Sequence, residues 1–221
     1  MSKKVVVFGT GIIGSEAIRQ YPRHNYEVLA AVSSKGLEGS DGRKVVFEKR
    51  GNPEEILSHV MPLCEKLGVD LVAFALPSGG PNAAKVELAL MMPFLKNGVK
   101  AVLAGKAALA EHYYELEPYL PQMGVNATVG GATMMLDEMK RHLRFDDGEN
   151  IVVELVINGT LSYIMTGVWA GRPLEAVIRE AVHLKFAEPG INNRMPDPLD
   201  VFKGEVEGDV PKKLRIILQN V

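Results

Sequence analysis

Apolar and polar residues follow two alternating patterns along this chain of 221 residues. Short, nearly continuous apolar runs predict strands that are buried on both faces, as in a parallel sheet. Between them, apolar residues recur at spacings of three and four, which predicts amphipathic helices. This alternation is typical of an α/β protein with a doubly wound parallel sheet. We expect strands over 5–8, 26–32, 70–76, 100–104, 124–131 and 151–157, and helices from residue 12 onward and over 53–67, 82–96, 133–142, 173–185 and 210–219.

A glycine motif follows the first apolar run and opens the first helical pattern. Gly9, Gly11 and Gly14 form G-x-G-x-x-G, in which the glycines permit a tight turn, a close approach to a pyrophosphate, and close packing of helix on strand. The order of strand, glycines and helix predicts a Rossmann domain that binds NAD(P), with Ile12 and Ile13 at the phosphate-binding helix N-terminus. The alternative is a glycine-rich turn without a ligand.

The end of the second strand indicates which dinucleotide is bound. A carboxylate there would bind the ribose 2′-hydroxyl of NAD, but the strand ends in Ser33, Ser34 and Lys35, with Arg43 and Lys44 following. Hydroxyl and cationic groups suit a 2′-phosphate, so NADP is favoured over NAD. The alternative is that Lys35 and Arg43 solvate a flexible, glycine-rich loop.

Two further loops follow strands whose carboxyl ends should face the cofactor. Pro77 and Ser78 follow the third strand and either contact the cofactor or form a tight turn. Lys106 follows the strand over 100–104, where a lysine could contact the cofactor and exchange a proton with an oxygen undergoing hydride transfer. The alternative for Lys106 is a surface lysine in the first turn of a helix.

Beyond residue 130 the pattern changes, and we expect a smaller α+β region over 131–221, after an NAD(P)-binding domain over 1–130. Asn158 and Gly159 predict a strand-to-helix turn with Thr160 near the cap. Residues 186–208 show no periodicity and predict a long loop. Asp209 can cap the last helix, within one turn of Lys213.

The composition narrows the class of protein. A net charge of −2 gives no electrostatic reason to expect nucleic acid or an anionic membrane as partner, and no apolar run reaches the ~18 residues of a membrane helix. The N-terminus passes directly into a strand, so we expect no signal peptide. The single cysteine, Cys64, excludes an intrachain disulfide and suits a reducing cytoplasm. The five histidines show no metal-ligand spacing, so we expect no metal site.

Taken together, the motifs resemble those of homoserine dehydrogenases, in the order of that family and over almost the whole chain. The most specific match is I-N-G-T-L-S-Y-I-M-T at 157–166. The others are G-T-G-I-I-G at 9–14, S-S-K at 33–35, G-K-A-A-L-A at 105–110, A-T-V-G-G at 127–131, A-E-P at 187–189, D-P-x-D-V at 197–201, and the pair Asp209 and Lys213 in D-x-x-x-K.

This resemblance implies reversible NAD(P)H-dependent reduction of L-aspartate 4-semialdehyde to L-homoserine, in threonine and methionine biosynthesis. It implies that residues 131–221 form the region for substrate binding, catalysis and dimerisation, and that Lys106 and Lys213 are catalytic lysines. It implies that Glu188 binds the substrate's amino group and that Asp209 is a further substrate-binding acid. Within the I-N-G-T signature it assigns Gly159, Thr160 and Tyr163 to substrate binding.

The sequence also departs from the family. Gly105 replaces the asparagine before the catalytic lysine, and Asn126 replaces the glutamate of a monovalent-cation site. Family members continue past the D-x-x-x-K helix, so we expect either a fragment or a shortened relative, in which a second subunit covers the apolar strand 151–157. The alternatives are a non-catalytic NAD(P)-binding relative that acts as a sensor or assembly partner, and a dehydrogenase of another small amino-acid semialdehyde.

Overall fold

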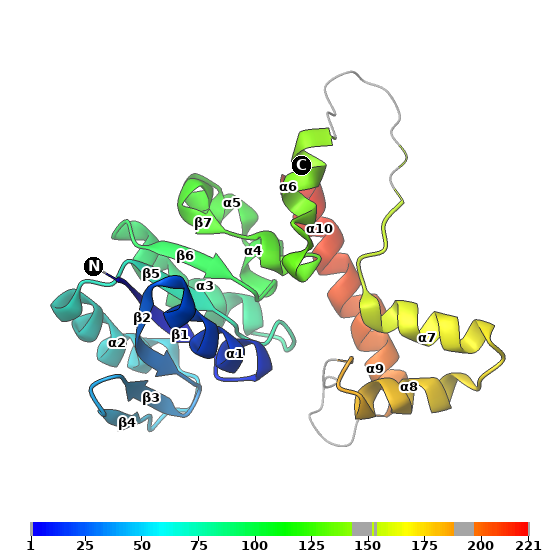
Figure 1. The fold of residues 1–221 in the computed structure, drawn as a ribbon, viewed down its shortest axis with the longest axis horizontal. Helices are drawn as coiled ribbons and strands as arrows, with labels where there is room; N and C mark the ends of the chain where they lie inside the picture. The colour runs from blue at the N-terminus through cyan, green and yellow to red at the C-terminus, as the bar shows by residue number, and fades with distance from the viewer. Residues whose placement is uncertain (1, 143–151, 153, 188–196, 221) are drawn as a thin grey trace. The chain divides into compact units, whose positions relative to one another are not determined.

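The computed structural model describes residues 2–142, 152, 154–187 and 197–220. Contacts divide the chain into unit 1, Met1–Gly131, and unit 2, Ala132–Val221. Figure 1 labels the helices and strands of the two units.

Unit 1 is built on a sheet of seven strands in the order β4-β3-β2-β1-β5-β6-β7. Strands β2, β1, β5, β6 and β7 are parallel, and β3 and β4 add an antiparallel edge beside β2. The predicted doubly wound parallel sheet is therefore confirmed. The strands are β1 (Lys3–Phe8), β2 (Tyr26–Val32), β3 (Gly36–Gly39), β4 (Lys44–Val46), β5 (Leu71–Phe74), β6 (Lys100–Leu103) and β7 (Met123–Gly124).

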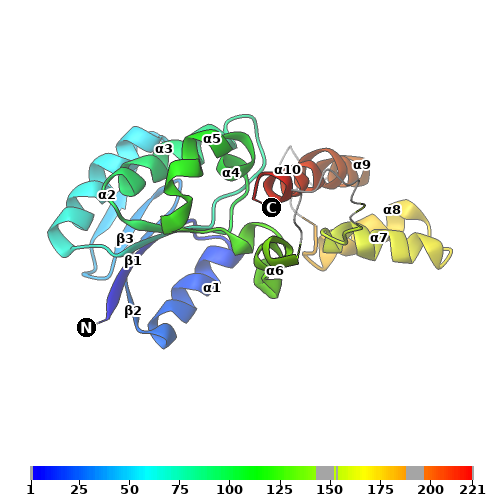
Figure 2. The same cartoon turned by 90° about the horizontal axis from the view of Figure 1, so that it is seen from above.

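Helices cover both faces of this sheet. Figure 2 shows α1 on one face and α2 and α3 on the other, which is the arrangement that right-handed crossovers produce when the chain winds outward from β1 in both directions. The α-helices of unit 1 are α1 (Ile12–Gln20), α2 (Pro53–Leu67), α3 (Ala83–Lys96), α4 (Ala107–Glu111) and α5 (Tyr113–Leu116). The short helices are η1 (Tyr21–His24), η2 (Glu117–Gln122) and η3 (Asn126–Thr128).

The core of unit 1 lies around β1, whose residues 5–8 are fully buried. The Phe8 ring stacks on Phe74 of β5 at a centroid distance of 4.7 Å and meets the edge of Phe94 of α3 at 5.7 Å. These contacts fix α3 against the centre of the sheet, so the loops after β1 and β5 start from a rigid base.

The segment after β2 differs from its prediction. A flexible loop was expected, but 36–39 and 44–46 form the antiparallel pair β3 and β4. Leu37 is buried, and Gly36 lies where a Cβ would be 2.2 Å from the Val45 carbonyl oxygen. The glycines thus allow two backbones to approach closely, which sequence periodicity over three or four residues does not reveal.

The described part of unit 2 is helical. A core of Ile164, Val177, Ile178, Ala181 and Val201 joins α7, α8 and α9. Gly167 permits this packing, because a Cβ there would lie 2.7 Å from Val177 Cγ1. The helices are η4 (Gly131–Thr133) at the unit boundary, then α6 (Met135–His142), α7 (Gly159–Trp169), α8 (Leu174–His183), α9 (Pro198–Lys203), the π-helix η5 (Gly204–Asp209) and α10 (Val210–Asn220).

Three predictions of local structure from residue 124 onward are wrong. Residues 152 and 154–157 form no strand, since no described strand pairs with them and alternate side chains such as Val156 are exposed. The strand over 124–131 shrinks to β7, and the chain then turns into η3. The loop predicted over 186–208 contains α9 and most of η5, whose proline, glycines and closely spaced acids conceal helical periodicity.

Candidate functional site

The three glycines after β1 have different surroundings, and these fit the three predicted roles. Gly9 has a φ of +104°, and a Cβ there would lie 2.2 Å from the Ala75 carbonyl oxygen after β5. A Cβ on Gly14 would lie 1.8 Å from the carbonyl oxygen of Gly9. Around Gly11, by contrast, a Cβ would meet no atom within 4 Å. The first and third glycines are therefore required by packing, and the second leaves open space beside the turn.

Helix α1 begins at the open side of this turn. Gly11 is its N-cap, in an extended conformation, and its first turn carries no acidic side chain. Ile12 and Ile13 at the start of the helix are exposed. A helix N-terminus with accessible backbone amides and no nearby carboxylate suits a phosphate group.

A cavity of about 330 Å³ lies at the carboxyl ends of β1, β2 and β5. Its walls are largely apolar, which suits a planar aromatic ring, and the ends of parallel strands are where open α/β sheets bind ligands. It is lined by residues of all three strand ends and of the start of α3, including Phe8, Val32, Ser33, Ser34, Gly51, Pro77, Gly79, Gly80 and Asn82.

The hydroxyl and cationic groups predicted at the end of β2 have separate roles. Ser33 Oγ accepts hydrogen bonds from the backbone amides of Lys35 and Gly36, at 3.1 and 3.2 Å, and so holds the turn into β3. Ser34 and Lys35 are exposed at the cavity's rim or beside it. Lys44 points to the hairpin instead, where its Nζ lies 2.6 Å from Glu38 Oε1.

A further cation, which the sequence did not indicate, lies at this rim. Arg50 Nε donates to Ser34 Oγ at 3.3 Å, and the Gly51 amide donates to the Ser34 carbonyl at 2.8 Å. Sixteen residues separate Arg50 from Ser34, so no local motif could have joined them. Arg50, Ser34 and Lys35 together place two exposed cations and a hydroxyl at the end of β2.

Lys106 lies at the carboxyl end of β6, immediately before α4, and is 8% exposed. The alternative of a surface lysine in a helix is therefore wrong. Its backbone amide donates to Ser78 Oγ at 2.9 Å. Ser78 is itself buried, so its side chain holds the loop of Lys106, while the neighbouring Pro77 lines the cavity.

A buried carboxylate on α3 contacts the same loop. Glu87 is 2% exposed, and its Oε2 accepts from the Ala108 amide at 2.8 Å. The sequence contained a signal for this residue, because Glu87 falls on the buried stripe formed by Ala84, Met91 and Phe94 at helical spacing. An acid at a core position of an amphipathic helix needs a buried partner.

Unit 2 contains a second polar group, centred on Asn158. Asn158 Nδ2 donates to Glu205 Oε2 at 2.6 Å and to Asp209 Oδ2 at 2.7 Å. Lys213 Nζ lies 2.6 Å from Asp209 Oδ2 and donates to the Ile157 carbonyl at 2.7 Å. Asn158, Glu205 and Asp209 are all buried. We call these four side chains, Asn158, Glu205, Asp209 and Lys213, the Asn158 cluster.

Local structure explains how the cluster assembles. Asn158 caps α7, with its Oδ1 accepting from the Leu161 amide at 2.7 Å, so its amide group is directed away from that helix. Asp209 ends η5 instead of capping a separate helix as predicted, and Lys213 follows one turn later in α10. The π-helix also brings Glu205 to the cluster, and such segments are frequent at functional sites. The sequence assigned no role to Glu205 and gave Asn158 only a role in a turn.

The other predicted substrate-binding residues have different surroundings. Thr160 Oγ1 donates to the Phe186 carbonyl at 2.7 Å, and Tyr163 packs against the Phe186 ring with a centroid distance of 5.3 Å. Gly159 is the first residue of α7. Glu188 lies outside the described residues.

Tyr163 also belongs to a group on the surface of unit 2. Arg172 forms an ion pair with Glu180, and this pair together with a hydrogen bond from Tyr163 lowers the pKa of the Glu180 carboxyl. The structure thus gives Tyr163 a structural partner that the sequence did not predict.

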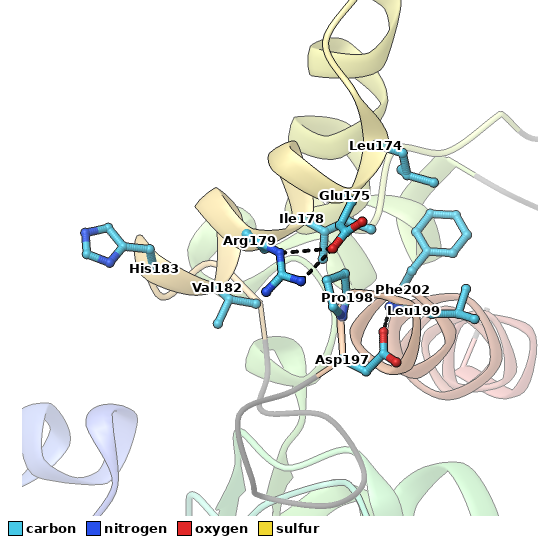
Figure 3. A pocket seen from close by; sticks show the side chains of 10 residues that line it. All are labelled: Leu174, Glu175, Ile178, Arg179, Val182, His183, Asp197, Pro198, Leu199 and Phe202. Carbon is cyan, nitrogen blue, oxygen red and sulfur yellow. Dashed lines mark hydrogen bonds and ion pairs between the residues drawn. The ribbon is translucent and has the colours of Figure 1, made fainter.

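A wide groove of about 860 Å³ lies beside α8 and α9 (Figure 3). Leu174, Leu199 and Phe202 contribute apolar surface, and Glu175 pairs with Arg179 on its α8 side at 2.5 Å. Asp197 accepts from the Leu199 amide at 2.9 Å, so it caps α9. The groove does not include the Asn158 cluster.

Neither metal nor membrane features occur in the part of the chain that the structure describes. Its histidine, cysteine and acidic side chains form no group of three that could hold a metal ion. None of its helices has the length and apolar character needed to span a membrane.

The sheet, the crossovers and the glycine turn place unit 1 in the class of Rossmann-type α/β domains. Within that class the chain resembles homoserine dehydrogenases, which confirms the resemblance predicted from its motifs. A homoserine dehydrogenase of Mycobacterium tuberculosis is 26% identical over 191 residues, covering 83% of this chain and 42% of the relative. Another, from Sulfurisphaera tokodaii, is 23% identical over 186 residues, covering 84% of this chain and 60% of the relative. The chain thus spans about half the length of the curated relatives it matches.

Solved structures show the same fold over nearly the whole chain. A hyperthermophilic archaeal homoserine dehydrogenase in complex with NADPH superposes with a TM-score of 0.65 at 21% identity, covering 98% of this chain and 69% of that one. The homoserine dehydrogenase of Thermoplasma acidophilum gives a TM-score of 0.62 at 19% identity, covering 96% and 67%. No protein-family model matches the chain.

Proposed function

We propose that this chain carries the NADP-binding and catalytic part of a homoserine dehydrogenase, which reduces L-aspartate 4-semialdehyde to L-homoserine reversibly. The observation that carries the proposal is the loop of Lys106. A buried lysine follows a strand of a Rossmann sheet, in a G-K-A-A-L-A sequence that resembles the family's motif.

The residues of unit 1 fit a dinucleotide. The open space at Gly11 and the start of α1 would take the pyrophosphate, with Ile12 and Ile13 supplying backbone amides. The apolar cavity would take the adenine ring. At its rim, Ser34, Lys35 and Arg50 offer a hydroxyl and two cations, and no carboxylate follows β2 directly, so a 2′-phosphate is favoured over a free 2′-hydroxyl.

The bound nicotinamide would supply the hydride for the aldehyde carbon. Lys106 would donate the proton that the aldehyde oxygen gains as it becomes a hydroxyl, and in the reverse direction it would accept that proton. Its ammonium would also stabilise negative charge developing on the oxygen. Burial favours this role, because a protein-lined site strengthens such an interaction compared with water.

Unit 2 would supply groups for the amino-acid part of the substrate. Asp209 would bind the substrate's ammonium group, together with Glu188 as the family resemblance implies, and Lys213 would act as the second lysine. Two observations support this assignment: Asp209 and Lys213 match the family's D-x-x-x-K pair, and their charged groups lie 2.6 Å apart across the junction of η5 and α10. We also propose that Gly159, Thr160 and Tyr163 contribute to substrate binding by fixing the conformation of α7.

A titration of cofactor affinity tests the first half of this proposal. Arg50→Ala should weaken NADPH binding about tenfold, as loss of one charge-assisted contact to a phosphate does, and leave NADH binding within twofold. Fluorescence of the nucleotide itself or calorimetry measures both affinities. Arg23→Ala on η1 is the matched surface control. Equal weakening of NADH and NADPH would show that Arg50 does not contact a 2′-phosphate.

The second candidate is a relative that binds NADP without catalysis, which Gly105 favours because a polar side chain is absent beside Lys106.

We place the reaction in the cytoplasm, in threonine and methionine biosynthesis. We also propose a homodimer, supported by exposed apolar side chains of unit 2 such as Val156 and Trp169. Sedimentation at high concentration checks the last point, and a strict monomer would contradict it.

A further inference from the structure

The loop that carries Lys106 is held by two buried side chains from different parts of unit 1. Ser78 accepts from the Lys106 amide at 2.9 Å, and Glu87 accepts from the Ala108 amide at 2.8 Å. Glu87 comes from α3, which packs against α4. The backbone is therefore anchored at Lys106 itself and again two residues later, and the second anchor is a carboxylate with 2% of its surface exposed.

Gly105, the residue before the lysine, has no side chain that would collide with this carboxylate. A Cβ on Gly105 would lie 2.1 Å from Glu87 Oε1 and 3.2 Å from the Leu76 carbonyl oxygen. The carboxylate therefore occupies the space that a side chain at position 105 would need. Any side chain there would have to displace Glu87 from the Ala108 amide, because the Leu76 backbone cannot move aside without disturbing the end of β5.

We propose that Glu87 is a positioning residue for Lys106: its carboxylate fixes the 105–108 loop, in space that Gly105 leaves free. The proposal rests on the proposed function for the role of Lys106, but the contacts of Glu87 are independent of it. A carboxylate that accepts a backbone amide at the start of α4 makes a charge-assisted hydrogen bond, which is stronger than one between neutral groups. Glu87 thus replaces, from a distant helix, the polar side chain that resemblance to the family would put at position 105.

The pairing of Glu87 with Gly105 makes a specific prediction about substitutions. Gly105→Asn alone should push the Glu87 carboxylate off the Ala108 amide and lower kcat by at least tenfold. Glu87→Ala alone should have a similar effect, since the amide loses its acceptor. In the double variant, Glu87→Ala makes room for the asparagine side chain introduced at position 105, and turnover should recover to well above that of either single variant. The KM for NADPH should stay within threefold throughout, because neither residue lines the cofactor cavity.

Hydrogen exchange provides a readout that does not depend on turnover. Peptides covering 104–110 should exchange at least tenfold faster in Glu87→Ala than in the wild type, and Glu87→Gln, which keeps an acceptor oxygen, should restore protection. Glu111→Ala, an exposed acid at the end of α4, is the matched control. Urea unfolding of each variant verifies that the fold is retained.

The two measurements separate the possible failures. Unchanged exchange over 104–110 in Glu87→Ala would overturn the positioning role, whatever the wild-type activity. If kcat of the double variant is as low as the two single losses multiplied together, the pairing of Glu87 with Gly105 is overturned. If exchange responds as expected while the wild type shows no turnover, the proposed function fails and the contacts of Glu87 remain established.

Discussion

Gly11 and Gly14 belong to the same motif but serve different purposes, one in ligand binding and the other in packing. A Cβ on Gly14 would lie 1.8 Å from the carbonyl oxygen of Gly9, whereas a Cβ on Gly11 would enter open space. Gly14→Ala should therefore destabilise unit 1 by about 2 kcal/mol or more, as overpacking does. Gly11→Ala should fold normally and weaken NADPH binding at least tenfold, because its methyl group enters the space for the pyrophosphate.

Thermal unfolding and NADPH titration on the two variants measure these effects side by side. The contradictory result is a Gly11→Ala protein that binds NADPH as tightly as the wild type. That outcome would mean the glycine motif is only a turn.

Cys64 is a second residue whose surroundings determine its chemistry. Burial in α2, with a smaller contribution from the charge of Glu65, raises the pKa of its thiol to about 12. At pH 8 only about one thiol in ten thousand would be ionised, and the thiolate is the reactive form. We expect iodoacetamide to leave the native protein unmodified at pH 8 and to alkylate it rapidly in urea, as mass spectrometry can show. Rapid alkylation of the native protein would place Cys64 at the surface.

At the scale of elements, Asn158 connects the start of α7 to η5 and α10. Its side chain caps α7 and donates to two acids on η5, one of which pairs with Lys213 of α10. Asn158→Ala should lower the free energy of unfolding of unit 2 by about 2–4 kcal/mol, combining about 1 kcal/mol for the cap with the cost of two buried acceptors that lose a donor.

Urea denaturation measures this loss, and Asn97→Ala, at the exposed end of α3, is a suitable control. Hydrogen exchange of peptides from α7 and α10 reports unit 2 specifically, whereas the exposed Trp169 side chain changes its surroundings little on unfolding. A change below about 0.5 kcal/mol, the range of ordinary surface substitutions, would show that the cluster does not support the helices.

Sequence patterns predicted those elements whose side chains follow a clear period. Strand β2 and helix α2 begin and end at the predicted residues, because both carry local signals. The strand is a short apolar run, and the helix starts at a proline and stops before a glycine. Elements stabilised by distant partners were missed. The β3–β4 pair depends on close backbone approach at Gly36, and α9 and η5 depend on packing against α8 and on Asn158.

The same distinction applies to the candidate site. Lys106, Asp209 and Lys213 lie in short motifs and could be singled out from the sequence. Arg50 and Glu87 could not be assigned, because their partners, Ser34 and Ala108, are 16 and 21 residues away. A carboxylate on the apolar face of a predicted helix shows that a buried partner exists without showing which one.

At the scale of the whole molecule, the proposed dehydrogenase chemistry uses side chains of a Rossmann unit and of a helical unit, in a chain that spans about half the length of the curated relatives it matches. The fold is shared with solved homoserine dehydrogenases over 96–98% of this chain. Activity depends on the groups at the site and not on the fold, so the reacting side chains are the place to test it.

The most direct test follows NADPH absorbance with L-aspartate 4-semialdehyde for the wild type, Lys106→Ala and the control Lys100→Ala, which removes an exposed lysine at the opposite end of β6. We expect turnover in the wild type and the control, and a loss of at least a hundredfold in Lys106→Ala, as for a positioned general acid, with NADPH affinity preserved. Wild-type turnover that persists in Lys106→Ala, or NADPH binding without any turnover in the wild type, would contradict the proposed function.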